Sequence, residues 1–194
     1  MGVLIGPNTL YYVIVRPKGK LREDFDFSDE KVRKPALLRP EMGERGTGDM
    51  ATTVIAITNQ KGGVGKTTTA AALLTGLHRR GAAVLGVDMD PQGSLGFSLG
   101  LDIEHCTTIY DVFRGQAEPE QAIVRTDTCD ILPSNILLSG AELEFNRPGR
   151  EFLLKTALSK VEDQYDYIII DTPPALSLLT VNAYVATDSL IIPM

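Results

Sequence analysis

The chain has 194 residues, 25 of them acidic and 19 basic, and therefore a formal charge of −6. Hydrophobic residues make up 43 % and charged residues 23 %, a balance that is typical of globular proteins and excludes a collagen-like, mucin-like or wholly disordered chain. No run approaches the ~18 apolar residues of a membrane-spanning helix, and the acidic balance argues against a chain-wide coat for nucleic acid.

The first residues do not have the pattern of a secretory signal. Residues 1–15 are fairly apolar, but Pro7 interrupts them and the first positive charges come only after them. This order is the reverse of a signal peptide, so a cytoplasmic protein is expected. The two cysteines, Cys106 and Cys129, have the spacing of neither a disulfide framework nor a zinc site, which favours reduced thiols in the cytosol.

Composition changes near Met50. Residues 1–50 hold 9 basic and 8 acidic side chains, whereas residues 51–194 hold 10 basic and 17 acidic ones. Residues 1–49 are interpreted as a disordered leader or linker, in which Leu10–Val15 is the one strand expected. Two explanations stay open for them. Either Met50 is the natural start and these residues are an upstream extension, or they form a regulatory, partner-binding tail.

From Thr53 onward, short β-branched runs alternate with helical stretches. In chain order we expect strand Thr53–Ile57, helix Lys66–Arg80, strand Val84–Val87, helices Thr108–Arg114 and Pro119–Val124, strand Asp130–Leu132, helix Phe152–Val161, strand Tyr167–Ile170, helix Leu176–Ala186 and strand Leu190–Ile192. Gly81 fits a left-handed cap after the first helix. The alternation predicts an α/β fold, a doubly wound and mostly parallel sheet with helices on both faces. Such a sheet binds its ligand at the carboxyl ends of its strands.

A glycine-rich loop connects the first of these strands to its helix. Residues 59–68 have the sequence Asn-Gln-Lys-Gly-Gly-Val-Gly-Lys-Thr-Thr. Glycines let successive backbone N–H groups line one concave anion site, and the following helix adds its free N-terminal donors. In this pattern Lys66 would contact the β- and γ-phosphates and Thr67 would supply a hydroxyl to Mg²⁺. Gln60 stands where the general motif has glycine, and an extra lysine, Lys61, precedes the first glycine of the loop.

Acidic residues follow two other strands at the same edge of the expected sheet. Asp88 and Asp90 come after the second strand, and Asp171 ends the run of three isoleucines in the fourth. A strand-end aspartate such as Asp171 is the usual source of the metal-binding carboxylate in phosphate-loop enzymes.

The residue after this aspartate cannot act as a base. Many ATPases place a glutamate there to orient the attacking water, but this chain has Thr172. A carboxylate from elsewhere must therefore position the water. Asp90 is the best candidate, and Asp88 is the rival, with a structural or outer-sphere metal function as its other interpretation.

With these motifs, the chain resembles the ParA/Soj branch of the ParA/MinD class of P-loop ATPases, which carry a deviant Walker A loop. The resemblance covers residues 52–194 and implies a P-loop ATPase domain over residues 50–194. The matching pieces are Lys61–Thr68, Asp88–Gly93, Ile131–Asn135, Ala141–Leu143, Ile168–Pro174 and Thr180–Ala183.

The resemblance implies a role for each matched residue. Members are homodimers with two ATP molecules between the subunits, and the residue matched by Lys61 reaches the phosphates of the opposite subunit, as an arginine finger does. By this match Lys61, Lys66 and Asp90 are catalytic. Thr67 and Asp171, the latter through water, hold Mg²⁺, with Asp88 as a further metal candidate. The nucleotide-binding residues are then Lys61, Gly62, Gly63, Val64, Gly65, Lys66, Thr67 and Thr68.

The resemblance also implies a biological context. It predicts an ATPase of weak intrinsic rate that acts in chromosome or plasmid partition, coats DNA non-specifically in its ATP form, and is stimulated by a centromere-binding ParB-like adaptor. Relatives continue beyond Met194, so the chain is expected to be truncated at its C-terminus and to lack the DNA contacts. Two alternatives stay open: a MinD-like positioning ATPase on membranes, and a truncated, non-catalytic nucleotide-binding fragment.

Overall fold

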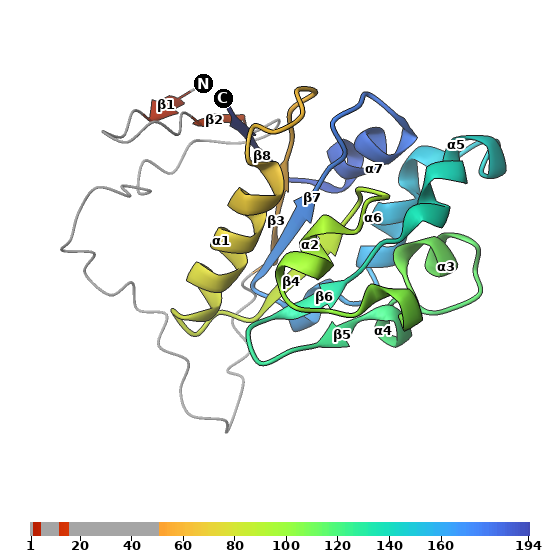
Figure 1. Ribbon diagram of the computed structural model, residues 1–194, viewed down its shortest axis with the longest axis horizontal. Coiled ribbons are helices and arrows are strands. Elements are labelled where there is room, and N and C mark those ends of the chain that lie inside the picture. Colours follow the sequence, from red (N-terminus) through yellow and green to blue (C-terminus); the bar gives the residue numbers. More distant parts are fainter. Residues whose placement is uncertain (1, 5–11, 16–50) are drawn as a thin grey trace.

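The computed structural model describes residues 2–4, 12–15 and 51–194. Its centre is a single eight-stranded sheet in the order β1-β2-β8-β3-β7-β4-β6-β5, shown in Figure 1. The strands are β1 (Gly2–Leu4), β2 (Tyr12–Val15), β3 (Thr53–Ile57), β4 (Val84–Asp88), β5 (Val124–Arg125), β6 (Asp130–Leu132), β7 (Tyr167–Asp171) and β8 (Ser189–Pro193).

The five strands expected from the sequence form the parallel centre of this sheet. β3 lies between β7 and β8, and β4 lies between β7 and β6, all in parallel pairs. The strands at the margins are antiparallel to their neighbours, β5 to β6 on one side and β2 to β8 on the other. The prediction of a mostly parallel sheet is therefore confirmed.

Helices cover both faces of the sheet, as expected for a doubly wound fold (Figure 1). On one face, α1 and α2 pack onto a cluster that includes Leu74, Ile131 and Ile169. On the other face, α3 to α7 pack onto a larger cluster that includes Ile168 and Ile170. The helices are α1 (Lys66–His78), α2 (Ser94–Ser98), α3 (Ile109–Phe113), α4 (Pro119–Ala122), α5 (Ala141–Glu144), α6 (Leu153–Leu158) and α7 (Leu178–Ala186).

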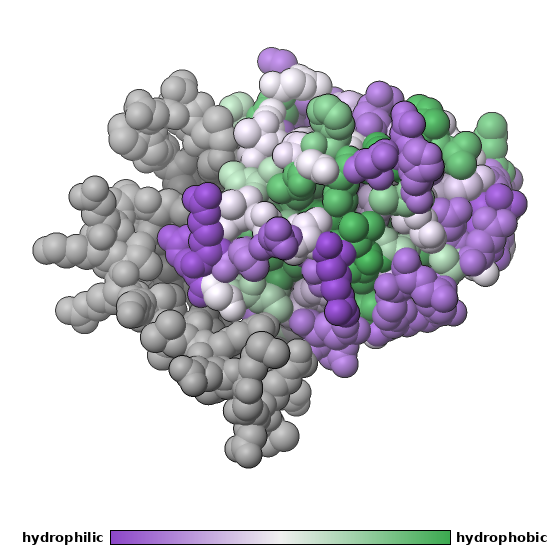
Figure 2. All heavy atoms as spheres, turned by 60° about the horizontal axis from the view of Figure 1, so that its bottom comes forward, coloured by the Kyte–Doolittle hydropathy of each residue, from purple (hydrophilic) through white to green (hydrophobic). Residues whose placement is uncertain are grey.

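Neighbouring isoleucines of β7 thus enter opposite cores, because side chains alternate across a strand. A central strand buried on both faces must therefore be apolar at every position, which explains its continuous hydrophobic run. On the face seen in Figure 2, hydrophilic side chains surround a band of apolar ones. Within the part of the chain that the structure describes, no helix combines the length and apolar character needed to cross a bilayer.

Two helices begin or end at other residues than the sequence analysis expected, because local hydrogen bonds determine their ends. α1 ends at His78 rather than Arg80, since the N–H of Arg80 donates to the carbonyl of Leu77 in a tighter final turn. Gly81 follows with a φ of 83°, which confirms the predicted left-handed cap. The helix expected at Thr108 begins one residue later because Thr108 is its N-cap and forms a capping box with Asp111.

Three other helix predictions were too long. α4 ends at Ala122, and Val124 instead begins strand β5, which pairs with β6. Phe152 belongs to a 3-10 turn before α6, and α7 starts after Ser177, its N-cap residue. The sequence analysis also missed α2, α5 and the 3-10 turns Ile103–His105, Ile136–Gly140, Arg150–Phe152 and Glu162–Gln164, which are too short to show a helical period.

The N-terminal residues contain two strands where one was expected. β2 confirms the expected strand over its last four residues, and β1 pairs with it in antiparallel register, so the prediction of a single strand was wrong. β2 also pairs with β8, whose edge offers backbone donors and acceptors that a passing strand can use. The leader prediction otherwise concerns residues that lie outside the described ones.

Substitutions at two glycines, one on β4 and one on α1, would test how α1 packs onto β4. A Cβ added to Gly86 would lie 2.7 Å from the Cδ1 atoms of both Ile131 and Leu74, whereas one added to Gly76 on α1 would meet only Arg80 Nη1, at 3.8 Å. We expect Gly86→Ala to lower the free energy of unfolding by roughly 1–3 kcal/mol through overpacking. Gly76→Ala should raise it by about 0.5–1 kcal/mol because alanine favours the helix. Urea unfolding of both variants measures this, and equal effects would contradict the packing described.

Candidate functional site

The glycine-rich loop spans residues 58–65, between the end of β3 and the start of α1. Gly63 and Gly65 have φ values of 73° and 84°, which lie in the left-handed region that side chains disfavour. A Cβ added at Gly62, Gly63 or Gly65 would meet no heavy atom within 4 Å, so the space beside the loop is open. The loop therefore has the backbone shape of an anion-binding nest with free space over it.

The first turn of α1 adds donors to this nest. Gly65 is the N-cap of the helix, and no side chain within the described residues accepts a hydrogen bond from the first-turn amides as a cap. These amides carry the positive end of a helix of 13 residues. A phosphate group is the kind of ligand that would satisfy them.

The two lysines of the loop differ in environment. Lys66 is the first residue of α1 and only 7 % exposed, and its Nζ donates to the carbonyl oxygen of Lys61 at 3.2 Å. Lys61 itself has an exposed side chain. One lysine of the loop is thus buried and bonded to the loop backbone, while the other is exposed.

Asn59 orders the start of the loop, a function that the sequence analysis missed. Its Oδ1 accepts the Lys61 N–H at 2.9 Å, and its Nδ2 donates to the carbonyl of Pro193 at 2.7 Å. The loop is therefore tied to the end of β8. Asparagine two residues before the extra lysine was the available signal, because asparagine commonly accepts from the backbone two residues ahead.

Asp171 is the acidic group that most needs a partner. It is fully buried at the end of β7, and neither of its carboxylate oxygens accepts a hydrogen bond from the described residues. Burial raises the pKa of Asp171 from 3.8 to about 7, the nearby Thr67 hydroxyl and Lys66 lower this pKa, and the charges of Asp88 and Asp90 raise it. A divalent cation beside Asp171 would remove this cost, so the carboxylate fits Mg²⁺.

Asp88 lies beside Asp171 in the register of β4 and β7, but its oxygens are already used. Oδ1 accepts the N–H of Asp90 at 3.0 Å, and Oδ2 accepts the N–H of Leu95 at 2.9 Å. Burial raises the pKa of Asp88 to about 6, while these two hydrogen bonds lower it. This geometry favours the structural interpretation of Asp88: it holds the loop between β4 and α2.

Asp90 stands on that loop and remains half-buried. Its Oδ1 accepts the N–H of Gln92 at 3.0 Å, and no other hydrogen bond to its carboxylate is present among the described residues. Thr172 is fully buried, and its hydroxyl donates to the carbonyl of Ile57 at 2.8 Å. The hydroxyl of Thr172 is thus committed to the backbone of β3, which agrees with a search for the water-orienting group elsewhere.

The described residues contain no group of three or more His, Cys, Asp and Glu side chains that could hold a metal alone. Magnesium in this site would need Thr67 and Asp171 together with phosphate oxygens and water, which is the manner in which Mg²⁺ binds with nucleotides. The donor set present therefore fits a metal that arrives with its nucleotide.

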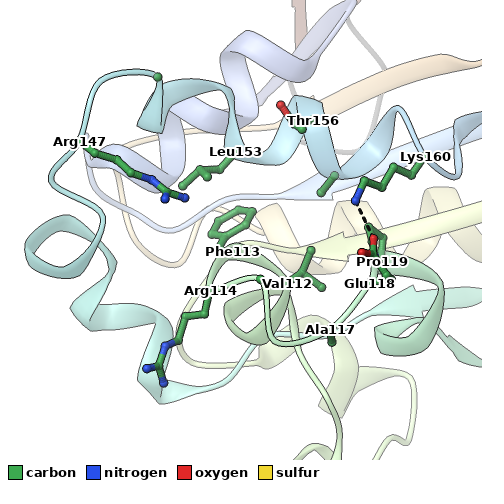
Figure 3. A pocket seen from close by; sticks show the side chains of 13 residues that line it. Val112, Phe113, Arg114, Ala117, Glu118, Pro119, Arg147, Leu153, Thr156 and Lys160 are labelled. Atoms are coloured by element: carbon green, nitrogen blue, oxygen red, sulfur yellow. Dashed lines mark hydrogen bonds and ion pairs between the residues drawn. The ribbon is translucent and has the colours of Figure 1, made fainter.

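A second hollow, of about 310 Å³, lies between α3, α4 and α6 (Figure 3) and contains no residue of the glycine-rich loop. Two of the three cationic side chains that line it form ion pairs. Lys160 Nζ contacts Glu118 Oε2 at 2.6 Å, and Arg114 Nε contacts Glu144 Oε1 at 2.9 Å. Arg147 lines the hollow as well, but the hollow lies apart from the glycine-rich loop and Asp171, so it is not part of the candidate site.

The glycine-rich loop offers amide donors to an anion, and Asp171, at the same edge of the sheet, offers oxygens to a cation. On a parallel α/β sheet, this combination places the chain in the class of P-loop nucleotide-binding proteins. Within that class, the family model described as "AAA domain" matches residues 52–194. The chain belongs to this family.

Two individual relatives show which proteins of this class the chain is similar to. Soj, the sporulation initiation inhibitor protein of Bacillus subtilis, is 48 % identical over 147 residues, which are 73 % of this chain and 57 % of Soj. The chromosome partitioning protein ParA of Myxococcus xanthus is 44 % identical over 156 residues, 78 % of this chain and 55 % of ParA. These matches confirm the resemblance to the ParA/Soj branch. The chain spans about half the length of these curated relatives.

A solved structure with similar coverage contains nucleotide. Cobyrinic acid a,c-diamide synthase from Mycobacterium smegmatis, with bound ATP analogue and magnesium, has a TM-score of 0.68 and 48 % sequence identity. The match covers 70 % of this chain and 55 % of that one. At this likeness the P-loop fold of the two chains is the same.

The buried carboxyl of Asp171 predicts a pH-dependent stability. The unfolded chain loses this proton near pH 3.8 and the folded, nucleotide-free protein near pH 7, so ionisation destabilises the fold increasingly between these values. Asp171→Asn should therefore raise the Tm of the nucleotide-free protein more at pH 8 than at pH 5. The same variant should lose the magnesium dependence of nucleotide affinity. Calorimetry at both pH values measures the first effect, with the exposed Asp163→Asn as control, and an equal rise at both would contradict the prediction.

Proposed function

We propose that the protein is an ATP-dependent switch of the ParA/Soj type that hydrolyses ATP to ADP and phosphate at a weak intrinsic rate. The observation that carries this proposal is the loop with one buried and one exposed lysine beside an unpartnered, buried aspartate. The partitioning proteins Soj and ParA, at 48 % and 44 % identity, support the same function. ATP and Mg²⁺ are the proposed ligands.

In this proposal each residue of the site has a separate role. The loop amides and Lys66 bind the phosphate tail, and Thr67 and Asp171, the latter through water, hold Mg²⁺, which supplies charge neutralisation for the leaving phosphate. Asp90 positions the attacking water and accepts its proton, since Thr172 cannot. Asp88 keeps the loop that carries Asp90 in place.

Lys61 is proposed to act across a homodimer. Lys61 is exposed, so it is available for contact with a second subunit. Large apolar side chains follow the carboxyl ends of β6 and β7 at this same edge, where Ile136, Leu137 and Leu176 are 61, 55 and 68 % exposed. Exposed apolar groups around a charged site are typical of an interface that closes over a ligand. We therefore infer a dimer with ATP between the subunits.

The proposed cellular role is chromosome or plasmid partition in the cytoplasm. The ATP-bound dimer would associate non-specifically with DNA at the nucleoid, and a centromere-binding, ParB-like adaptor would stimulate hydrolysis and release. No stable membrane association is proposed. The names and functions of the matched partitioning proteins support this role.

Two substitutions should separate dimerisation from turnover. Lys61→Ala should abolish hydrolysis and weaken the dimer, because it removes a cation delivered in trans, an effect on the order of 10³-fold or more. Asp90→Ala should keep the ATP-dependent dimer but lower kcat by roughly 10²–10⁴. Sizing by light scattering with ATP and phosphate release measure both. Lys155→Ala on α6 is the matched control for lysine loss, and normal turnover in Asp90→Ala would refute the water-positioning role.

The cargo class is tested by what stimulates turnover in the full-length protein. We expect double-stranded DNA to raise the rate of phosphate release, and vesicles of anionic phospholipid to leave it unchanged. Stimulation by vesicles alone would indicate the MinD-like alternative. Nucleotide binding without turnover would indicate the non-catalytic alternative, and turnover only with a cobyrinic acid would indicate an amide synthase. Each of these three results would overturn the proposal.

A further inference from the structure

We propose that Ser134 is a positioning residue for ATP hydrolysis: its hydroxyl holds the backbone of Asp90, so that the Asp90 carboxylate meets the attacking water. This inference rests on the proposed function of Asp90 and extends it to a side chain from a different strand of the sheet. Ser134 lies two residues beyond the end of β6.

The contact that carries the proposal is direct. Ser134 is fully buried, and its Oγ donates a hydrogen bond to the carbonyl oxygen of Asp90. The same oxygen accepts the N–H of Gly93 at 2.9 Å. A buried hydroxyl with one defined acceptor fixes that acceptor in place, because breaking the bond would leave a polar group unsatisfied.

The loop also rests on the backbone of Ser134. Gly93 has a φ of 66°, and a Cβ added to it would lie 3.2 Å from the Ser134 carbonyl oxygen and 2.3 Å from Ile103 Cδ1. The segment that carries Ser134 is itself anchored, since the carbonyl of Pro133 accepts the N–H of Ile109, at the start of α3, at 2.9 Å. Ser134 therefore presents its hydroxyl from a rigid support.

Asp90 is held from two opposite sides as a result. On one side Asp88 Oδ1 accepts the Asp90 N–H at 3.0 Å, and on the other Ser134 binds the Asp90 carbonyl. The two anchors flank the Cα of Asp90 and so limit rotation of the peptide groups that direct its side chain. Positioning of this kind matters for rate because a shift of about 1 Å at a reacting group costs up to 10²-fold.

The test compares Ser134→Ala with the parent in steady-state ATP hydrolysis by the full-length protein. Loss of one neutral hydrogen bond to the loop should lower kcat by roughly three- to tenfold. KM and the affinity for a non-hydrolysable ATP analogue should stay unchanged, since the phosphate loop is untouched. Ser134→Thr keeps the hydroxyl and should recover kcat. Ser139→Ala, which removes an exposed hydroxyl bonded to the Ile136 carbonyl, is the control and should leave kcat unchanged.

A double variant distinguishes positioning from general stability. If Ser134 acts through Asp90, adding Ser134→Ala to Asp90→Ala should lower kcat no further, whereas independent effects would multiply. An unchanged kcat in Ser134→Ala, or equal losses in affinity and kcat, would overturn the inference while a slow Asp90→Ala still upheld the role of Asp90. Normal turnover in Asp90→Ala would overturn both. If Ser134→Ala does not fold, Ser134→Cys decides, because its thiol is a weaker donor of similar size. A lower kcat with unchanged KM supports positioning, and a parental kcat would overturn the inference.

Discussion

The register of three parallel strands is the constraint on which the site depends. Ile57 of β3 and Asp88 of β4 both pair with Asp171 of β7, so all three strands end at one level. The glycine-rich loop leaves from the first, the Asp90 loop from the second, and the carboxylate proposed to bind metal, that of Asp171, stands on the third. A slip of one residue would turn each strand-end side chain to the opposite face.

This arrangement places two carboxyl groups where burial disfavours their ionised form in the absence of a bound cation. Asp88 and Asp171 are both fully buried in the low-dielectric interior, and burial raises the pKa of each carboxyl group. Asp88 offsets the cost with two backbone hydrogen bonds, whereas Asp171 has oxygens left for a cation. The free energy that Asp171 costs the nucleotide-free fold is thus available as affinity for magnesium with its phosphates. Stability and ligand binding oppose each other at this residue.

At the same edge of the sheet, side chains from segments far apart in the chain hold the loops of the candidate site. Asn59 joins the phosphate loop to the carbonyl of Pro193, and Ser134 joins the Asp90 loop to the end of β6. In both cases a small polar side chain donates to a backbone carbonyl of another element. Such contacts carry no motif of their own, and they help to hold the two loops of the candidate site in place.

The sequence alone determined the five parallel strands, the loop with Lys61 and Lys66, and the acidic residues at the strand ends, because strand burial and phosphate binding each require particular residue types at fixed spacing. It did not determine the short turns, strand β5, or the pairing of β1 and β2 beside β8, which depend on contacts with distant residues. It also left Asp88 open, as a further metal candidate beside Asp171, as a rival of Asp90 for the water, or as a structural residue. Only the tertiary structure separated these interpretations, since hydrogen bonding to Asp88 comes from a loop whose path is decided by packing against Ser134 and Ile103.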